Sequence, residues 1–313
     1  MSRTIKTAAC AIVCLAIAAP AAPTGPLAAQ QSGAAASPTL TRIKQSGRIR
    51  FGYQSDARPF SYRDQSGNAA GFTVALCKTV AGAVKDELGV QALSVEWIAV
   101  GPADRFTAVS TGKVDAFCGA DTDTWSRRAA VAFSLPVFPG GIGALLRKDA
   151  PERLSEILNQ KPPSNPTWRA SAGQLLQTQT FTVIKGTTAE PWLNGKVNEF
   201  KLTSKIAPVT SYDAGITAVL DRSASVFFGD RSVLLDAITH HPSGSKLEVL
   251  DRLFTYEAFA LPLPRGDEGF RALVDRALSR LYPTPEFRAL YVESFGEPTA
   301  DVVTFYRWNT RPE

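Results

Sequence analysis

From residue 49 onward, short runs of apolar residues alternate with segments in which apolar residues recur every three or four positions. The short runs are typical of buried strands, and the longer spacing is typical of helices that bury one face. Strands that alternate with helices predict an α/β fold built on mostly parallel sheets. In the first part of the chain the expected strands span residues 49–53, 95–100 and 114–118, and the expected helices span residues 72–88, 105–110 and a segment beginning at Thr124.

A second set of strands and helices follows a polar, proline-rich interval over residues 151–179. An apolar extended run near residues 256–263 then leads to the last helical patterns of the chain. The expected strands of this part span residues 181–184, 206–209 and 225–228, and the expected helices span residues 213–220, 230–238, 270–281 and 285–295.

The order of these elements predicts two lobes, because one set is inserted between two parts of the other. We expect the first lobe over residues 39–145 and 258–313 and the second lobe over residues 146–257. Two crossings of the chain would join the lobes. The segment over residues 133–146 is rich in proline and glycine, so it is a candidate hinge.

The amino terminus predicts export. Arg3 and Lys6 precede an apolar, alanine-rich stretch over residues 8–19 that is too short to span a bilayer. We therefore expect a cleaved signal peptide over residues 1–29, a flexible segment over residues 30–38 and a mature product in the periplasm.

Composition narrows the class of partner. With 313 residues, of which 44% are hydrophobic and 20% charged, the chain can build two ordinary cores. The formal net charge is +5, but no basic run interleaves with aromatic residues. Nothing in the sequence therefore indicates a nucleic-acid partner.

Two cysteines, Cys77 and Cys118, remain after the expected cleavage. An oxidising compartment favours a disulfide between them. The alternative is a pair of small buried apolar side chains, a common role of free cysteines.

The chemically rich loops all follow expected strands. In open α/β sheets, ligands bind beyond the carboxyl ends of the strands. The loops at these positions span residues 54–60, 119–127, 186–190 and 228–230. If the lobes face each other, these loops line one cleft.

Arg127 is the first candidate for ligand binding in this cleft. It follows small and hydroxylated residues at an expected strand-to-helix junction, where free N–H groups and the helix dipole favour an anion. A guanidinium can hold both oxygens of a carboxylate, so a carboxylate is the expected anion. The alternative is a capped helix with a solvated surface arginine.

Several motifs together resemble a known family, the solute-binding proteins of polar amino acid ABC transporters, family 3. The resemblance extends from Thr39 to Phe295 and is nearest to the glutamate/aspartate-binding type. The motifs are the segment Thr39–Ile49, Pro59-Phe60-Ser61-Tyr62, Gly71-Phe72, Gly112-Lys113-Val114-Asp115-Ala116, Arg127, Phe133-Ser134 and Gly186-Thr187-Thr188.

The resemblance implies a type 2 periplasmic binding fold and a site for an amino acid. Arg127 would hold the ligand carboxylate, with help from the backbone and hydroxyl groups of Ala120 and Thr122. Thr187 and Thr188 would close on the same carboxylate from the second lobe.

Some of the remaining site residues match the family pattern and others differ from it. Asp230 would hold the α-ammonium group, although an aspartate at a helix start is also a common N-cap. Gln54 and Tyr212 stand where the acidic-ligand type has an arginine and a histidine, whereas Arg105 matches an arginine of that type. Asp121 adds a carboxylate that would repel an acidic ligand side chain unless Arg105 or Arg58 intervenes. The sequence therefore does not identify glutamate as the ligand.

Partners and rivals follow from the same resemblance. It implies a small-molecule ligand, a membrane ABC permease, a monomer, no metal and no cofactor. The rivals are a periplasmic ligand sensor and a lyase on the same scaffold, similar to cyclohexadienyl or arogenate dehydratase, with Glu190, Asp230 and Asp121 as candidate acids. The sequence shows no recognisable acid/base pair, so we expect that the protein is not an enzyme.

Three further residues or segments have plain structural interpretations. We expect Phe60 to pack in the core and Arg58 to be solvated. The segment Gly140–Gly143 lacks the helix and acidic partner of a dinucleotide site, so we interpret it as a flexible crossing.

Overall fold

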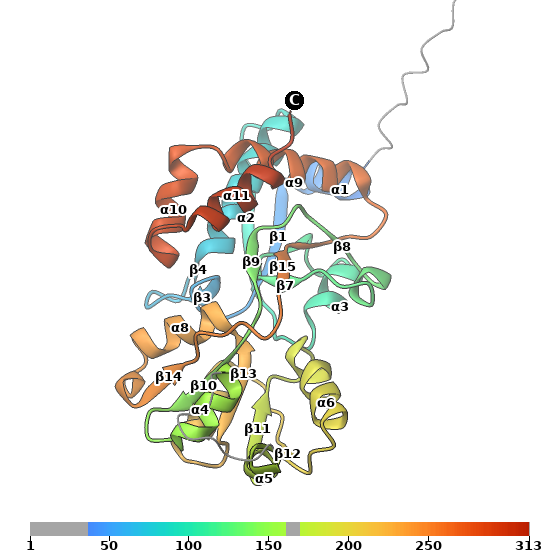
Figure 1. Cartoon of the computed structure of the whole chain (residues 1–313). Coiled ribbons are helices and arrows are strands. Elements are labelled where there is room, and N and C mark those ends of the chain that lie inside the picture. Colours follow the sequence, from blue (N-terminus) through green and yellow to red (C-terminus); the bar gives the residue numbers. More distant parts are fainter. Residues whose placement is uncertain (1–36, 161–169, 313) are drawn as a thin grey trace, which may run out of the picture. The chain divides into compact units, whose positions relative to one another are not determined.

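The computed structural model describes residues 37–160 and 170–312, which belong to one unit of the chain, residues 34–313 (Figure 1). The expected signal peptide, residues 1–29, and nearly all of the expected flexible segment, residues 30–38, lie outside the described residues. Both ends of the described chain, blue and red in Figure 1, belong to the first lobe, and the green-to-orange middle of the chain forms the second.

The first lobe is built on a parallel sheet with the strand order β5-β1-β6. Its central strand β1 buries Ile49 and Phe51, and Phe51 is in register with Trp97 and Ala116 of the neighbouring strands. The elements of this lobe are α1 (Pro38–Ser46), β1 (Arg48–Tyr53), β2 (Asp56–Ala57), β3 (Ser61–Arg63), β4 (Ala69–Ala70), α2 (Phe72–Leu88), β5 (Ser94–Ala99), α3 (Arg105–Ser110), β6 (Ala116–Phe117), β7 (Asp121–Thr122), the 3₁₀ helix η1 (Arg127–Ala129), β8 (Ala132–Phe133), β9 (Phe138–Gly140), β15 (Glu257–Ala260), β16 (Pro262–Leu263), α9 (Glu268–Leu281), α10 (Pro285–Phe295) and α11 (Ala300–Asn309).

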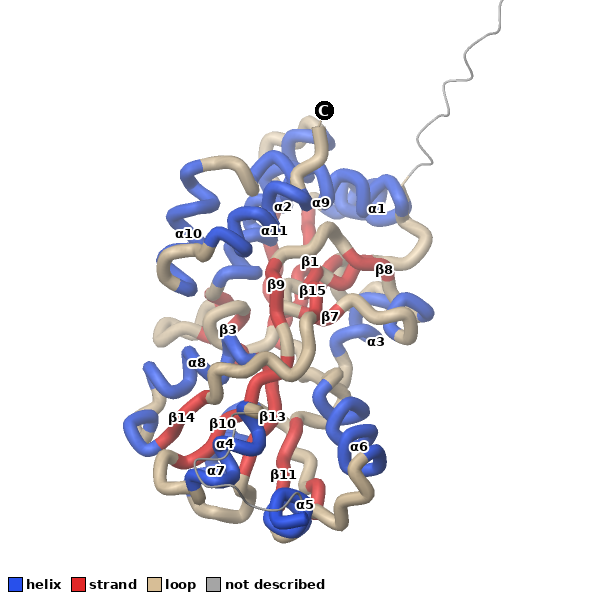
Figure 2. The backbone as a smooth tube through the Cα atoms, in the orientation of Figure 1, coloured by secondary structure: helices blue, strands red, loops and turns tan. Residues whose placement is uncertain are grey.

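The second lobe is built on a five-stranded sheet with the order β12-β11-β13-β10-β14, which helices flank in Figure 2. Helices α7 and α8 contact β10 and β13. The elements of this lobe are β10 (Ile142–Arg147), α4 (Glu152–Asn159), α5 (Ala170–Gln177), β11 (Thr180–Val183), α6 (Ala189–Glu199), β12 (Lys205–Ile206), α7 (Tyr212–Leu220), β13 (Val226–Asp230), α8 (Arg231–His240), the 3₁₀ helix η2 (Gly244–Lys246) and β14 (Leu247–Val249).

One strand of the second sheet departs from the expected parallel arrangement. Strands β11, β12 and β13 are parallel, but β10 is antiparallel to β13 and β14. The register explains the reversal, because Ile142 at the start of β10 pairs with Asp230 at the end of β13. The chain enters β10 from the crossing, so β10 runs away from the first lobe while its neighbours run toward it. The expected two-lobed α/β fold is otherwise confirmed.

The two crossings lie side by side as antiparallel strands. Glu257 pairs with Gly140, and Phe259 with Phe138. A Cβ on Gly140 would collide with the Phe259 ring, and one on Gly141 would collide with the Thr255 carbonyl. The structure thus gives these glycines a packing role, the close approach of two backbones, in place of the flexible crossing expected from the sequence.

A helix cap and one shared carboxylate hold the start of the first lobe in place. Ser37 Oγ accepts a hydrogen bond from the Leu40 N–H at the start of α1. Asp267 caps α9 through the Phe270 N–H and also accepts from the Thr39 N–H, 228 residues away in sequence. One buried aspartate therefore joins the first and third-last helices.

Helix α11, like α1, α4 and α5, is an element that the periodicity did not predict. It docks through Tyr306, which is buried and whose hydroxyl donates to the Val137 carbonyl (2.8 Å). This contact places the end of the described chain against the segment that leads to the first crossing.

Aromatic packing forms much of the first core. Phe60 contacts the rings of Phe72, Phe138, Phe259 and Phe295. Phe60 is 1% exposed, which confirms the expectation of core packing. These rings come from both crossings and from the last helices, so they tie together segments that are distant in sequence.

Candidate functional site

All of the ligand-binding residues predicted from the sequence line one small cavity, of about 40 Å³, between the two lobes. The first lobe supplies loops that follow β1, β5 and β6, and the second supplies the starts of α6, α7 and α8. The lining residues are Gln54, Ala57, Phe60, Pro102, Arg105, Gly119, Ala120, Asp121, Thr122, Arg127, Ile184, Thr187, Thr188, Tyr212, Asp230 and Val233.

A disulfide anchors the loop that carries Ala120, Asp121 and Thr122. Cys118 ends the segment after β6 and is bonded to Cys77 of α2. The expected pairing of these two cysteines is therefore present in the structure. The bridge fixes the beginning of the cavity loop to the longest helix of the lobe.

The helix expected to begin at Thr124 is wrong. The chain forms only the single 3₁₀ turn η1. Thr124 Oγ1 accepts a hydrogen bond from the Arg127 N–H (3.2 Å), as a helix N-cap does. The segment nevertheless ends as strand β8 three residues after η1, where Ala132 and Phe133 pair with β16. No helix dipole from this segment therefore assists Arg127, and the guanidinium itself must supply the positive charge.

Arg127 has backbone acceptors but no carboxylate partner among the described residues. Its Nη1 donates to the Thr122 carbonyl (2.7 Å), its Nη2 to the Gly186 carbonyl of the second lobe (3.5 Å), and it lies over the Phe106 ring. Desolvation by burial lowers the pKa of Arg127, while the negative charge of Asp121 opposes that shift. The side chain therefore holds a partly desolvated positive charge at the cavity.

Arg105 differs from Arg127 because it has an acidic partner. Its Nε donates to Asp121 Oδ1, and the two residues are 4% and 5% exposed. Asp121 thus does meet an arginine, the condition that the sequence raised. The other carboxylate oxygen, Asp121 Oδ2, is buried and has no hydrogen-bond partner among the described residues.

The second lobe contributes Thr187 and Thr188 at the start of α6. The Thr187 hydroxyl donates to the Ile184 carbonyl (2.7 Å), and the Thr188 hydroxyl donates to Glu257 Oε2 (2.9 Å). The N–H groups of the first turn of α6 lie at this end, where a helix attracts anions.

Glu257 is the residue beside the cavity that sequence reasoning missed. Its Oε2 accepts from the hydroxyls of Thr122 and Thr188, one from each lobe, and its Oε1 accepts from Thr255 (2.7 Å). It lies at the start of an apolar run, so no local pattern distinguishes it.

Asp230 lies at the N-cap position of α8 but makes no side-chain capping bond. Its Oδ2 instead accepts from the Tyr212 hydroxyl (2.8 Å). Removal of water around the carboxylate raises the pKa of Asp230 to about 7, and the Tyr212 hydrogen bond acts in the opposite direction. Burial also raises the pKa of Tyr212 well above its usual value, so Tyr212 stays a donor.

Gln54 connects the first loop to the second lobe. Its Nε2 donates to Asp56 Oδ1 (2.9 Å), and Asp56 Oδ2 accepts from the Tyr212 N–H (3.2 Å). The Gln54 amide group is therefore engaged in holding a contact between the lobes.

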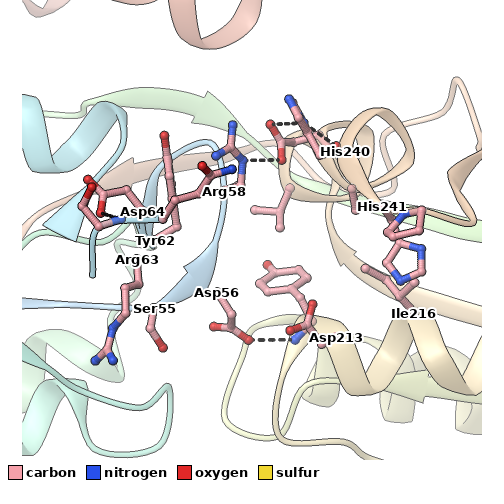
Figure 3. Close-up of a pocket in the computed structure, with 17 residues that line it drawn as sticks. Ser55, Asp56, Arg58, Tyr62, Arg63, Asp64, Asp213, Ile216, His240 and His241 are labelled. Atoms are coloured by element: carbon pink, nitrogen blue, oxygen red, sulfur yellow. Dashed lines mark hydrogen bonds and ion pairs between the residues drawn. The ribbon is translucent and has the colours of Figure 1, made fainter. Parts of the chain in front are cut away.

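A larger, open groove of about 630 Å³ adjoins the cavity and shares Tyr212 and Val233 with it (Figure 3). Arg58 of the first lobe forms an ion pair there with Asp236 of α8 (3.3 Å), and His240 contacts the same carboxylate (3.2 Å). The Arg58 side chain is 41% exposed, so it does contact solvent as expected, but it also bridges the lobes through this ion pair.

Within residues 37–160 and 170–312, the structure contains no group of three or more His, Cys, Asp or Glu side chains that could hold a metal ion. In the same ranges, every helix is too short or too polar to cross a membrane.

Comparisons with known proteins agree with this geometry. Residues 49–297 match the profile of the bacterial extracellular solute-binding proteins, family 3. The L-glutamate/L-aspartate-binding protein of Pseudomonas aeruginosa is 25% identical over 261 residues, which cover 83% of this chain and 80% of that protein. The glutamate/aspartate import solute-binding protein of Escherichia coli is 24% identical over 294 residues, which cover 94% and 90%.

A solved structure is similar over most of its length. It is an ancestral amino acid-binding protein described as a precursor of cyclohexadienyl dehydratase; it is 26% identical, covers 82% of this chain and 99% of its own, and has a TM-score of 0.66. The curated relatives are named as binding proteins. With a profile match over most of its length and a charged cavity between two lobes, the chain belongs to the bacterial extracellular solute-binding proteins, family 3.

Proposed function

We propose that this protein captures an amino acid, or a related small carboxylate, in the periplasm and delivers it to a membrane ABC permease. One observation carries the proposal. Arg127 of the first lobe and Asp230 of the second line one cavity, and neither forms an ion pair among the described residues. An α-amino acid carries the two complementary charges on adjacent groups, so it matches both at once. The names of the curated relatives support this choice of ligand.

The ligand carboxylate binds to Arg127. The guanidinium presents parallel donors that suit both oxygens of a carboxylate. Thr187 and Thr188 cover the same group with the first turn of α6, and Ala120 and Thr122 border it from the first lobe. A partly desolvated arginine gains more from this contact than an exposed one, because water screens it less.

The ligand ammonium group binds to Asp230. The carboxylate is already oriented by the Tyr212 hydroxyl, so little rearrangement is needed. Because burial raises the pKa of Asp230 to about 7, a cation beside it restores the charged form.

Ligand binding favours closure of the lobes. The contacts that join the lobes in this structure include Thr188 with Glu257 and Arg58 with Asp236. A ligand held by Arg127 on one lobe and Asp230 on the other adds to these contacts only when the lobes are closed. The permease then recognises the closed, loaded protein. We propose that the protein acts as a monomer.

The test is calorimetry with amino acids on the mature protein and on Arg127→Ala. Loss of a bidentate, charge-assisted contact should weaken binding by about 2–4 kcal/mol. Arg127→Lys should recover only part of it, because an ammonium group lacks the planar fork.

Arg128→Ala is the matched control, since Arg128 is adjacent but pairs with Asp123 outside the cavity. Binding by Arg127→Ala as tight as that of Arg128→Ala would refute the role of Arg127, and no binding of any amino acid by the parent protein would refute the function itself.

A further inference from the structure

The ion pair of Arg105 and Asp121 forms one wall of the cavity. Each nitrogen of the Arg105 guanidinium already has an acceptor: Asp121 Oδ1 for Nε, the Pro102 carbonyl for Nη1 and the Gly186 carbonyl for Nη2. Its plane also lies over the Phe106 ring. Three of the five N–H donors of Arg105 are therefore engaged within the protein, and Asp121 neutralises its charge.

Asp121, unlike Arg105, has an atom without a partner. Its Oδ2 is buried and has no hydrogen-bond partner among the described residues, although the residue lines the cavity. An unsatisfied buried carboxylate oxygen is costly, and a donor that reaches it removes that cost. A second carboxylate in its place would leave two negative oxygens facing each other.

The charges around the cavity also disfavour an acidic ligand side chain. Asp121, Asp230 and Glu257 carry negative charge when ionised, and among the described residues that line the cavity only Arg105 and Arg127 oppose them. An amino acid with an uncharged side chain adds no net charge to this set. An acidic one adds a further negative charge where negative groups already outnumber the arginines.

The size of the cavity limits the side chain. About 10–15 Å³ of such space holds one water molecule, and the closed cavity has about 40 Å³. Ligands with short side chains therefore require the least opening.

We infer that Asp121 selects, within the proposed amino-acid site, a ligand with a short, uncharged side chain that donates a hydrogen bond, such as a hydroxyl or an amide, and rejects acidic side chains. This inference rests on the proposed function. It separates the chain from its relatives named for glutamate and aspartate. Arg105 acts as a positioning residue, because it holds one oxygen of Asp121 and leaves the other for the ligand.

The first arm of the test uses the parent protein and pairs of nearly isosteric ligands. Calorimetry should show L-asparagine binding at least about 100-fold more tightly than L-aspartate, since a site built for a donor rejects an analogue that lacks it. L-serine should bind about tenfold more tightly than L-alanine, as expected for one hydrogen bond to a charged group. This arm needs no variant, so it holds even if a variant fails to fold.

The second arm uses Asp121→Asn, with Asp123→Asn as the control. Asp123 lies two residues away and pairs with Arg128 outside the cavity. An asparagine can keep its oxygen toward Arg105 and turn its amide N–H groups toward the ligand. The preference for L-asparagine over L-aspartate should then fall at least tenfold in Asp121→Asn and stay unchanged in Asp123→Asn, with circular dichroism to check folding.

The outcomes separate the two claims. If L-aspartate or L-glutamate binds the parent as tightly as L-asparagine and L-serine, or if Asp121→Asn keeps the parent preference, the inference is overturned while the proposed function stands. If no amino acid binds the parent, both are overturned.

Discussion

Two arginines line the same cavity and stack on the same Phe106 ring, yet their surroundings differ. Arg105 is neutralised within its own lobe by Asp121, whereas Arg127 has only backbone carbonyl acceptors among the described residues. A buried ion pair neutralises its own charge and forms part of the cavity wall. A partly buried cation without an anion is incomplete until a ligand supplies one. The comparison teaches that burial and charge type alone do not identify the ligand-binding arginine; the presence of a partner does.

The largest expected difference between the two arginines is in the stability of the folded protein. Arg105→Ala leaves Asp121 buried without its partner, so the free energy of unfolding should fall by about 3–5 kcal/mol. Arg127→Ala removes a cation that already lacks a carboxylate, so it should change stability by less than about 1 kcal/mol. Urea unfolding of both variants without ligand measures the difference. Equal losses would show that the two arginines have the same structural role.

Much of this contrast could not be predicted from the sequence. Arg127 is recognisable because it follows a run of small and hydroxylated residues near a strand end. The sequence names Arg105 and Arg58 as candidate partners of Asp121, but nothing local shows that Arg105 is the partner or that one oxygen stays unsatisfied. Glu257 is less visible still: its partners Thr122 and Thr188 lie 135 and 69 residues away.

The fold shows the same division. Apolar periodicity predicts the strands and long helices, since burial of one face follows from residue spacing. It does not predict that β10 runs antiparallel, because that direction depends on where the chain crosses between lobes. It also fails at Thr124, where the chain makes one 3₁₀ turn and then pairs as β8 with the distant strand β16.

The carboxylates allow a second test of the comparison, through pH. Asp121 is paired with Arg105, whereas burial raises the pKa of Asp230 to about 7 in the ligand-free protein. A bound ammonium group favours the ionised form and lowers that pKa, so binding below pH 7 releases a proton. Affinity should therefore be nearly constant above pH 7 and fall by about tenfold for each pH unit below it.

Calorimetry in buffers of different ionisation enthalpy measures both the affinity and the proton released. Asp230→Asn should bind weakly and lose this pH dependence. His240→Gln should keep it, because His240 lies in the neighbouring groove and contacts Asp236. A slope that disappears in His240→Gln and persists in Asp230→Asn would show that Asp230 is not the group responsible for the pH dependence.

The smallest expected effect concerns closure of the lobes. It measures how much of the affinity for the ligand held by Arg127 depends on a contact between the lobes. Thr188→Val keeps the side-chain shape but removes the hydroxyl that donates to Glu257 across the lobes. One charge-assisted hydrogen bond of the closed state is lost, so ligand affinity should fall by about 1 kcal/mol, mainly through faster release. Thr217→Val, at an exposed position of α7, is the matched control. Stopped-flow release rates that are equal in the two variants would indicate that Glu257 stabilises the first lobe through Thr122 alone and takes no part in holding the lobes together.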